Sequence, residues 1–364
     1  MDCDKTKLAR IFENTNICFL FGAGTSVMKE KDILSFPLMS DLIETVRKDD
    51  NVTSFYLSLK ERSNGDSDQY CIIKSIFDKY LFSKDANIEK FLSMLDSSEQ
   101  FIVNQDFRDE VSLSCAQIKN CVRKRISQSE TSNILPVYKK FYKAIHHLKE
   151  ISSSEKQCAD IFTTNYDMLN ELALEDLGIH YYSGFYGIAK RKFNLAFYDH
   201  EFVNVHKIKG ANYIVDSDHI NLYKLHGSLS WFYDTECNEL IEISPFNNDF
   251  EPEIIYPAST KFQKTNSIVY YSSLMREFSD KICSENTTLI VIGNSLSDEH
   301  INKMIENALS INTFTLVVFG YNEREIENLK ERYNRYNNVI VYPEGKTLLT
   351  LSEFILNLGM RNNE

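Results

Sequence analysis

Five short apolar runs, each ending in glycine, proline or polar residues, constrain the fold of this chain most. They are NICFLFGAGTS from Asn16, CADIFTTNYD from Cys158, TTLIVIGNSLS from Thr287, FTLVVFGYNE from Phe314 and NNVIVYP from Asn337. Continuous apolar runs of this length are typical of parallel strands that helices cover on both faces. Because helical periodicity lies between the runs, the sequence predicts an α/β fold with a doubly wound parallel sheet.

The helices between these runs carry recognisable start and stop residues. After GNSLS, apolar residues recur at helical spacing from Ile301 onward. We expect Ser297 to cap this helix, with Asp298 in its first turn. The helix that follows TTNYD should end at Gly178, because glycine readily adopts the left-handed conformation that closes a helix.

Residues 42–148 break this alternation. They show helical periodicity and no convincing strand, so we expect a large helical insertion after the first βα unit. Within it, Ile88, Phe91, Leu92 and Leu95 follow the spacing of one helix face. Most such faces must pack internally, but a remainder could meet another copy of the chain, so we expect a homo-oligomer. A second excursion, residues 181–219, is aromatic and turn-rich and is interpreted as a hairpin or flap.

Composition excludes several classes of protein. The chain has 364 residues and a formal net charge of -12, which argues against a direct nucleic-acid-binding surface. Its first ten residues lack an apolar signal core, and no apolar run approaches the roughly 20 residues of a membrane helix. We therefore expect a cytoplasmic protein. None of the eight cysteines forms a C-x-x-C pair, so we expect no zinc site.

The turn after the first run is a candidate phosphate loop. Glycines at Gly22 and Gly24, around Ala23, would let the backbone approach a phosphate, and Thr25 and Ser26 open the next segment. The dinucleotide fingerprint requires a third glycine that this chain lacks. A tight turn without a ligand is therefore the alternative interpretation.

Three later turns carry further candidates. Asn165 and Asp167 stand where a strand should end and a helix begin, so each is either a helix cap or a ligand-binding side chain. His226, in LYKLHGSLSW, follows another predicted strand and precedes a glycine. Open α/β sheets bind ligands at the carboxyl ends of their strands, although a lone histidine often satisfies only local hydrogen bonds. The third turn contains Gly293, Ser295 and Leu296.

Taken in order, the motifs G-A-G-x-S, T-x-N-x-D, H-G and G-x-S-L resemble the sirtuin family. They are most similar to the bacterial sirtuin-like NAD hydrolases of antiphage defence. The resemblance covers residues 16–30 and about 158–322 and implies a Rossmann-like domain that binds NAD. The insertion lies outside this shared core.

The resemblance also implies roles for single residues. It places the turn from Gly22 to Ser26 at the NAD pyrophosphate, Asn165 and Asp167 near the nicotinamide ribose, and His226 as the catalytic histidine. Further nucleotide contacts are implied for Gly293, Ser295, Leu296 and Asn322. Deacylating sirtuins carry paired zinc-binding cysteines and a glutamine where this chain has Thr164, so the resemblance does not extend to their zinc module.

The implied activity is hydrolysis of NAD to nicotinamide and ADP-ribose, with NAD as substrate and without zinc. Two alternatives stay open: an ADP-ribosyl or acyl-group transferase that uses the same intermediate, and a non-catalytic sensor of NAD or ADP-ribose that gates a partner. In the family, stand-alone proteins of this size resemble the partner of a HerA-type hexameric ATPase, so such a partner is expected here.

Overall fold

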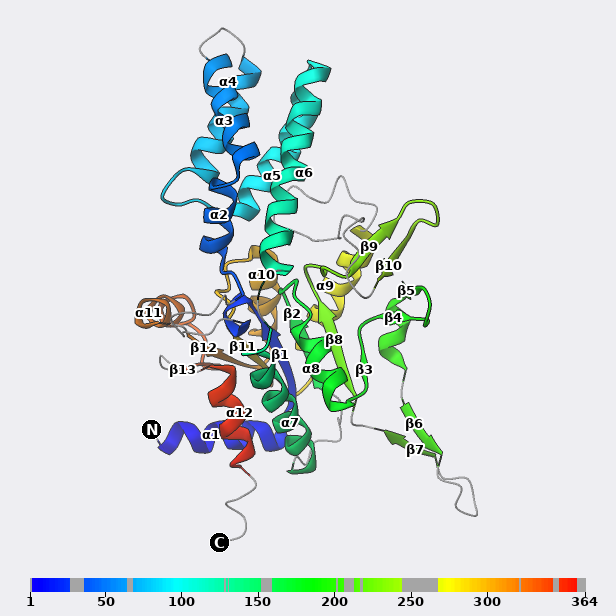
Figure 1. Cartoon of the computed structure of the whole chain (residues 1–364). Coiled ribbons are helices and arrows are strands. Elements are labelled where there is room, and N and C mark those ends of the chain that lie inside the picture. The colour runs from blue at the N-terminus through cyan, green and yellow to red at the C-terminus, as the bar shows by residue number, and fades with distance from the viewer. Residues whose placement is uncertain are drawn as a thin grey trace. The chain divides into compact units, whose positions relative to one another are not determined.

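A parallel seven-stranded sheet organises most of the chain in the computed structural model (Figure 1). The structure describes residues 2–26, 36–63, 68–127, 129, 131–151, 159–200, 202–205, 213–216, 219–243, 268–320, 322–342 and 347–358. The chain divides into two compact units. The sheet unit comprises residues 1–26, 131–254 and 267–364, and the helical unit comprises residues 27–130 and 255–266.

The order of the strands is β13-β12-β11-β1-β2-β8-β3, and every neighbouring pair is parallel. Their bounds are β1 Asn16–Phe21, β2 Ala159–Thr163, β3 Tyr181–Tyr182, β8 Ile220–Lys224, β11 Thr287–Ile292, β12 Thr315–Phe319 and β13 Val339–Tyr342. All residues of β2, β8 and β11 are buried, as expected for strands covered on both faces. The predicted doubly wound α/β fold is confirmed.

Helices cover the two faces of this sheet. Figure 1 shows α7 (Leu135–Ile151) and α12 (Leu348–Leu356) on the near face, and α9 (Ile268–Ile282) and α10 (Glu299–Ala308) behind it. The remaining helices of this unit are α1 Asp2–Asn14, α8 Leu169–Leu177 and α11 Glu323–Arg332. The predicted stop at Gly178 is confirmed: this residue follows α8 with a φ of 68°. The predicted cap at Ser297 is wrong, because the Asp298 side chain accepts the hydrogen bonds from the first backbone amides of α10.

Helix α7 packs directly on β1. Phe141 meets Phe19 and Phe21 edge-on, with ring centroids 5.1 and 5.2 Å apart, and Tyr138 lies against Phe21 at 6.3 Å. Phe19 and Phe21 share one face of β1 because side chains alternate along a strand. The sequence range suggested for the insertion, 42–148, included most of α7, whereas this helix belongs to the sheet unit. In the sequence, most of the helical unit therefore falls between β1 and α7.

The helical unit has its own aromatic core. Its helices are α2 Met39–Arg47, α3 Asp50–Arg62, α4 Asp68–Ile76, η2 Phe77–Leu81, α5 Ile88–Ser98, η3 Glu99–Phe101 and α6 Gln105–Ser127. Phe77 stacks on Tyr56 at 5.7 Å and meets Phe91 edge-on at 4.8 Å. The predicted α5 face, from Ile88 to Leu95, is fully buried.

The aromatic excursion forms more than a hairpin. Strand β3 joins the edge of the main sheet, while other segments form a separate antiparallel sheet in the order β4-β5-β10-β9. These strands are β4 Phe185–Tyr186, β5 Arg191–Phe193, β9 Trp231–Asp234 and β10 Glu239–Glu242. A short 3-10 helix, η4 (Leu195–Asp199), and the pair β6 (Phe202–Val205) and β7 (Tyr213–Asp216) complete this region.

Candidate functional site

The four motif turns follow four adjacent strands of the sheet, β11, β1, β2 and β8. Because all four strands are parallel, their carboxyl ends lie at one edge, and backbone hydrogen bonds join the turns there. Leu225 N donates to Thr163 O at 2.9 Å, and Leu229 N donates to Tyr166 O at 3.1 Å. After β1 the chain forms β2 and β8 on one side of β1, and later it forms β11 on the other side. This edge therefore includes the topological switch point between β1 and β11.

The two glycine turns touch each other at this switch point. Gly24 N donates to Gly293 O at 2.9 Å. A Cβ on Gly22 would lie 2.5 Å from Gly293 O, and a Cβ on Gly293 would lie 2.3 Å from Thr25 N. The glycines are therefore required for this close packing, whether or not a phosphate approaches them. The amides of Gly22 and Thr25 are also bonded to backbone carbonyls, so fewer amides face a ligand than the phosphate-loop interpretation assumed.

A buried polar cluster joins the first turn to the second. Asn165 Nδ2 donates to Thr25 Oγ1 at 3.2 Å and to Ser26 Oγ at 3.3 Å, and Ser26 Oγ donates to Asp167 Oδ2 at 3.1 Å. The Tyr138 hydroxyl lies 2.9 Å from Thr25 Oγ1 and 2.8 Å from Ser26 Oγ. All five residues are buried. The structure thus brings together the side chains that the sequence had placed in two separate motifs.

Asp167 combines the two roles considered for it. Its Oδ1 accepts a hydrogen bond from Leu169 N at 3.1 Å at the start of α8, and its Oδ2 accepts from Ser26. Burial raises the pKa of Asp167, although Lys224 and the hydrogen bonds from Leu169 and Ser26 oppose this effect. A positive charge that developed nearby would stabilise the ionised carboxylate.

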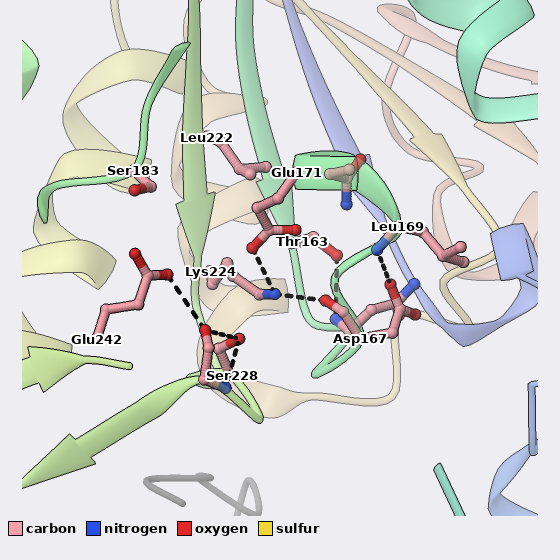
Figure 2. Close-up of polar contacts among 12 residues, drawn as sticks. Thr163, Asp167, Leu169, Glu171, Ser183, Leu222, Lys224, Ser228 and Glu242 are labelled. Carbon is pink, nitrogen blue, oxygen red and sulfur yellow. Dashed lines mark hydrogen bonds and ion pairs between the residues drawn. The ribbon is translucent and has the colours of Figure 1, made fainter. Parts of the chain in front are cut away.

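Lys224 ties the second turn to strand β8, as Figure 2 shows. Its ammonium group is fully buried, donates to Glu171 Oε1 at 2.8 Å and also donates to the carbonyl oxygen of Asp167. Glu242 has two further polar contacts: Ser230 Oγ donates to its Oε1 at 3.2 Å, and Arg191 pairs with it. The buried ion pair of Lys224 and Glu171 fixes geometry more than it adds stability, because desolvation offsets the attraction between the two charges.

His226 pairs with Asp298. Its Nε2 lies 3.3 Å from Asp298 Oδ2, a close approach whose alignment falls short of a hydrogen bond in this structure. Burial raises the pKa of Asp298, but His226 and the amides of Ile301 and His300 outweigh it, so the pKa of this carboxyl lies below its ordinary value. The carboxylate is therefore the form that faces the imidazole.

The turn after β11 holds Leu296 in an unusual conformation. Its φ is 52°, in the left-handed region that leucine rarely adopts. Its carbonyl oxygen accepts hydrogen bonds from Asn302 Nδ2 and, at 2.8 Å, from Arg332 Nη1. Asn294 Nδ2 also donates to Thr164 Oγ1 at 3.2 Å, which links this turn to the second motif. Strained backbone held by several partners is common at functional sites.

Two predicted contact residues have local structural roles. Asn322 follows β12 and caps α11, where its side chain accepts a hydrogen bond from Glu325 N at 2.9 Å. Ser295 is exposed, and its hydroxyl bonds to Ser297 Oγ at 3.0 Å. Neither contact excludes a nucleotide, but the cap already accounts for an asparagine at position 322.

A family model for the SIR2-like domain matches residues 159–341, half of the chain. The chain belongs to the SIR2-like family. SIR2-like domains bind NAD and act as NAD-dependent enzymes. No curated protein matches the chain.

The SIR2-like segment contains Asn165, Asp167, His226 and the Gly293 turn, but it begins after the Gly22 turn and after Tyr138. In three dimensions those earlier residues contact Asn165 and Asp167 in the buried polar cluster. No helix in the described part of the chain is long and apolar enough to cross a membrane. Over the same residues, no group of three or more potential metal ligands comes together.

Three residues of this candidate site carried no signal that the sequence analysis used. Tyr138 lay inside the range assigned to the insertion, and Asp298 was read only as a first-turn acid. Lys224 stood in an apolar strand and carried no motif. A lysine within an otherwise buried strand was the one available clue, because a buried lysine needs a partner.

Proposed function

We propose that the protein hydrolyses NAD to nicotinamide and ADP-ribose. The observation that carries this proposal is the convergence of four motif turns at the ends of four adjacent parallel strands. The turn after β2 brings an amide and a carboxylate, and the turn after β8 brings an imidazole, to one edge of the sheet. This is the chemistry that cleavage of the nicotinamide–ribose bond requires.

The reaction needs little acid catalysis, because nicotinamide in NAD is already a cationic leaving group. The bond between the ribose C1′ and the pyridinium nitrogen breaks, and its electron pair leaves with neutral nicotinamide. The carboxylate of Asp167 stabilises the positive charge that develops on the ribose. Water then adds to C1′, Asn165 orients that water or the ribose hydroxyls, and His226 accepts the proton that the water loses.

Incubation of the purified protein with NAD, with and without an acylated peptide, tests this proposal. Release of nicotinamide without peptide supports hydrolysis. Release that depends on the peptide would indicate a transferase, and tight binding without turnover would indicate a sensor.

We further propose that this activity depletes cellular NAD in antiphage defence and depends on assembly. The support is the motif resemblance, together with exposed apolar side chains on the helical unit, among them Phe101, Val103 and Leu113. The proposed partners are further copies of the chain and a HerA-type hexameric ATPase. Light scattering over a concentration series, and plaque assays with His226→Ala, test the two halves of this proposal.

A further inference from the structure

The Tyr138 hydroxyl lies at the centre of the buried polar cluster, although the proposed chemistry gives it no role. Tyr138 belongs to α7 and lies outside the SIR2-like segment. Its side chain is fully buried, with the ring against Phe21 and the hydroxyl within hydrogen-bonding range of Thr25, Ser26 and Asn165. A buried phenol that contacts three residues of a proposed site restricts how those residues can orient.

The protons of the two smaller hydroxyls are already committed. Thr25 Oγ1 donates to Gly22 O at 2.7 Å, and Ser26 Oγ donates to Asp167 Oδ2 at 3.1 Å. Each hydroxyl has a single proton, so both oxygens present lone pairs toward Asn165 and Tyr138. The group of Asn165 that faces them must therefore be a donor, which is its amide nitrogen.

Tyr138 completes this arrangement as a donor. Burial raises the pKa of Tyr138, so its hydroxyl keeps its proton. With the protons of Thr25 and Ser26 directed elsewhere, the phenol proton points at one of these two oxygens. The phenol therefore holds that hydroxyl in the orientation that accepts a hydrogen bond from Asn165 Nδ2.

We propose that Tyr138 is a positioning residue that fixes the amide of Asn165 with Nδ2 turned into the cluster and Oδ1 left as the acceptor for the substrate. Within the described part of the chain, no residue donates a hydrogen bond to Asn165 Oδ1. This inference rests on the proposed function, because it assigns Asn165 the task of accepting a hydrogen bond from the attacking water or a ribose hydroxyl. A flipped amide would offer only a donor there.

The chain provides a matched control on the same helix. Tyr142 is also fully buried on α7, and its hydroxyl donates to Asn170 Oδ1 at 2.7 Å, outside the cluster. Tyr142→Phe therefore removes the same chemical group from the same helix without touching Asn165. Any general effect of removing a buried phenol from α7 should appear in both variants.

The test uses the full chain labelled with 15N at asparagine, with the side-chain signal of Asn165 assigned by comparison with Asn165→Ala. Without NAD, Tyr138→Phe should shift the Asn165 amide signals and speed their exchange with water, whereas Tyr142→Phe should leave them as in the wild type. With NAD, Tyr138→Phe should lower kcat about tenfold, the effect of one lost hydrogen bond, with NAD affinity unchanged.

Asn165 signals in Tyr138→Phe that match those of the wild type would overturn the inference, as would an unchanged kcat. If Tyr138→Phe does not fold, Thr25→Val removes one of the two acceptors and should produce the same shift. A wild-type protein that does not turn over NAD would refute the proposed function, while the amide signals would still report on the positioning of Asn165.

Discussion

Nε2 of His226 lies 3.3 Å from Oδ2 of Asp298, and the other carboxylate oxygen of Asp298 accepts hydrogen bonds from the first amides of α10. One carboxylate thus joins the end of β8 to the helix that follows β11. A carboxylate beside an imidazole favours a proton on the facing nitrogen and leaves the other nitrogen as the base. We therefore predict two separable tasks for Asp298, capping the helix and orienting His226.

Substitution of Asp298 should separate these tasks. Asparagine caps helices about as well as aspartate, so Asp298→Asn should keep the hydrogen bonds of the cap and lower kcat. Asp298→Ala should lower kcat as well, and the lost cap should make it about 1 kcal/mol less stable to unfolding than Asp298→Asn. Steady-state kinetics and urea unfolding measure the two effects. Full activity in Asp298→Asn would show that the carboxylate has no role at His226.

Asn165→Ala should abolish hydrolysis while NAD binding weakens only slightly. We expect this split because the amide is proposed to act mainly on the transition state, so its loss should reduce turnover rather than affinity. Calorimetry with NAD, beside a nicotinamide-release assay, measures both quantities. Loss of NAD binding in a folded variant would instead make Asn165 an anchor for the ground state.

The two buried aspartates should affect stability in opposite directions as pH changes. The fold raises the pKa of Asp167, so the stability that Asp167 contributes is complete below about pH 4 and is lost as pH rises through the raised value. The fold lowers the pKa of Asp298, so its contribution is present above about pH 4 and is lost as pH falls through the lowered value.

At neutral pH, Asp167→Asn should therefore melt at a higher temperature than the wild type, and Asp298→Asn at a lower one. The difference for Asp167→Asn should shrink as the pH falls toward about 4, whereas the difference for Asp298→Asn should persist at about pH 4 and shrink only below it. Melting curves across this range measure them. Melting temperatures that move in the same direction in both variants would contradict the assigned pKa shifts.

The contact between the two glycine turns can be tested with two alanine substitutions. Gly293 and Gly178 both have positive φ, 64° and 68°, but only Gly293 has backbone atoms where a Cβ would lie. Gly178→Ala should cost about 1 to 2 kcal/mol, the penalty for a left-handed alanine. Gly293→Ala should cost clearly more in unfolding free energy, because the Gly24 and Thr25 backbone must move. Equal costs would show that the turns do not pack as closely as described.

Local sequence patterns predicted the strands and turns well, because each depends on a few neighbouring residues. The run before Gly22 and the stop at Gly178 are examples, since apolar runs and glycine conformations act over short distances. The cap of α10 was misplaced by one residue because Ser297 and Asp298 are both good caps. Asp298 also contacts His226 at the end of β8, which β1 and β2 separate from β11 in the sheet, and no local pattern encodes such a contact.

The sequence predicted some members of the polar cluster and missed Tyr138, again because local patterns do not encode distant contacts. Thr25, Ser26, Asn165 and Asp167 stand in recognisable motifs, so the sequence pointed to them. Tyr138 stands in a helix whose pattern records only that one face is apolar, and a tyrosine on such a face is usually read as core. That its hydroxyl meets Ser26 follows from the packing of α7 on β1, which no local pattern encodes.

Hydrolysis of NAD at this site has one direct test. Nicotinamide release from NAD is measured for the wild type and for His226→Ala, without any acylated peptide. We expect nicotinamide and ADP-ribose in equal amounts from the wild type. For a folded His226→Ala variant we expect a rate about 100- to 10,000-fold lower, the usual effect of losing a general base. Equal rates in the two proteins, or no release by the wild type in any state of assembly, would contradict hydrolysis at this site.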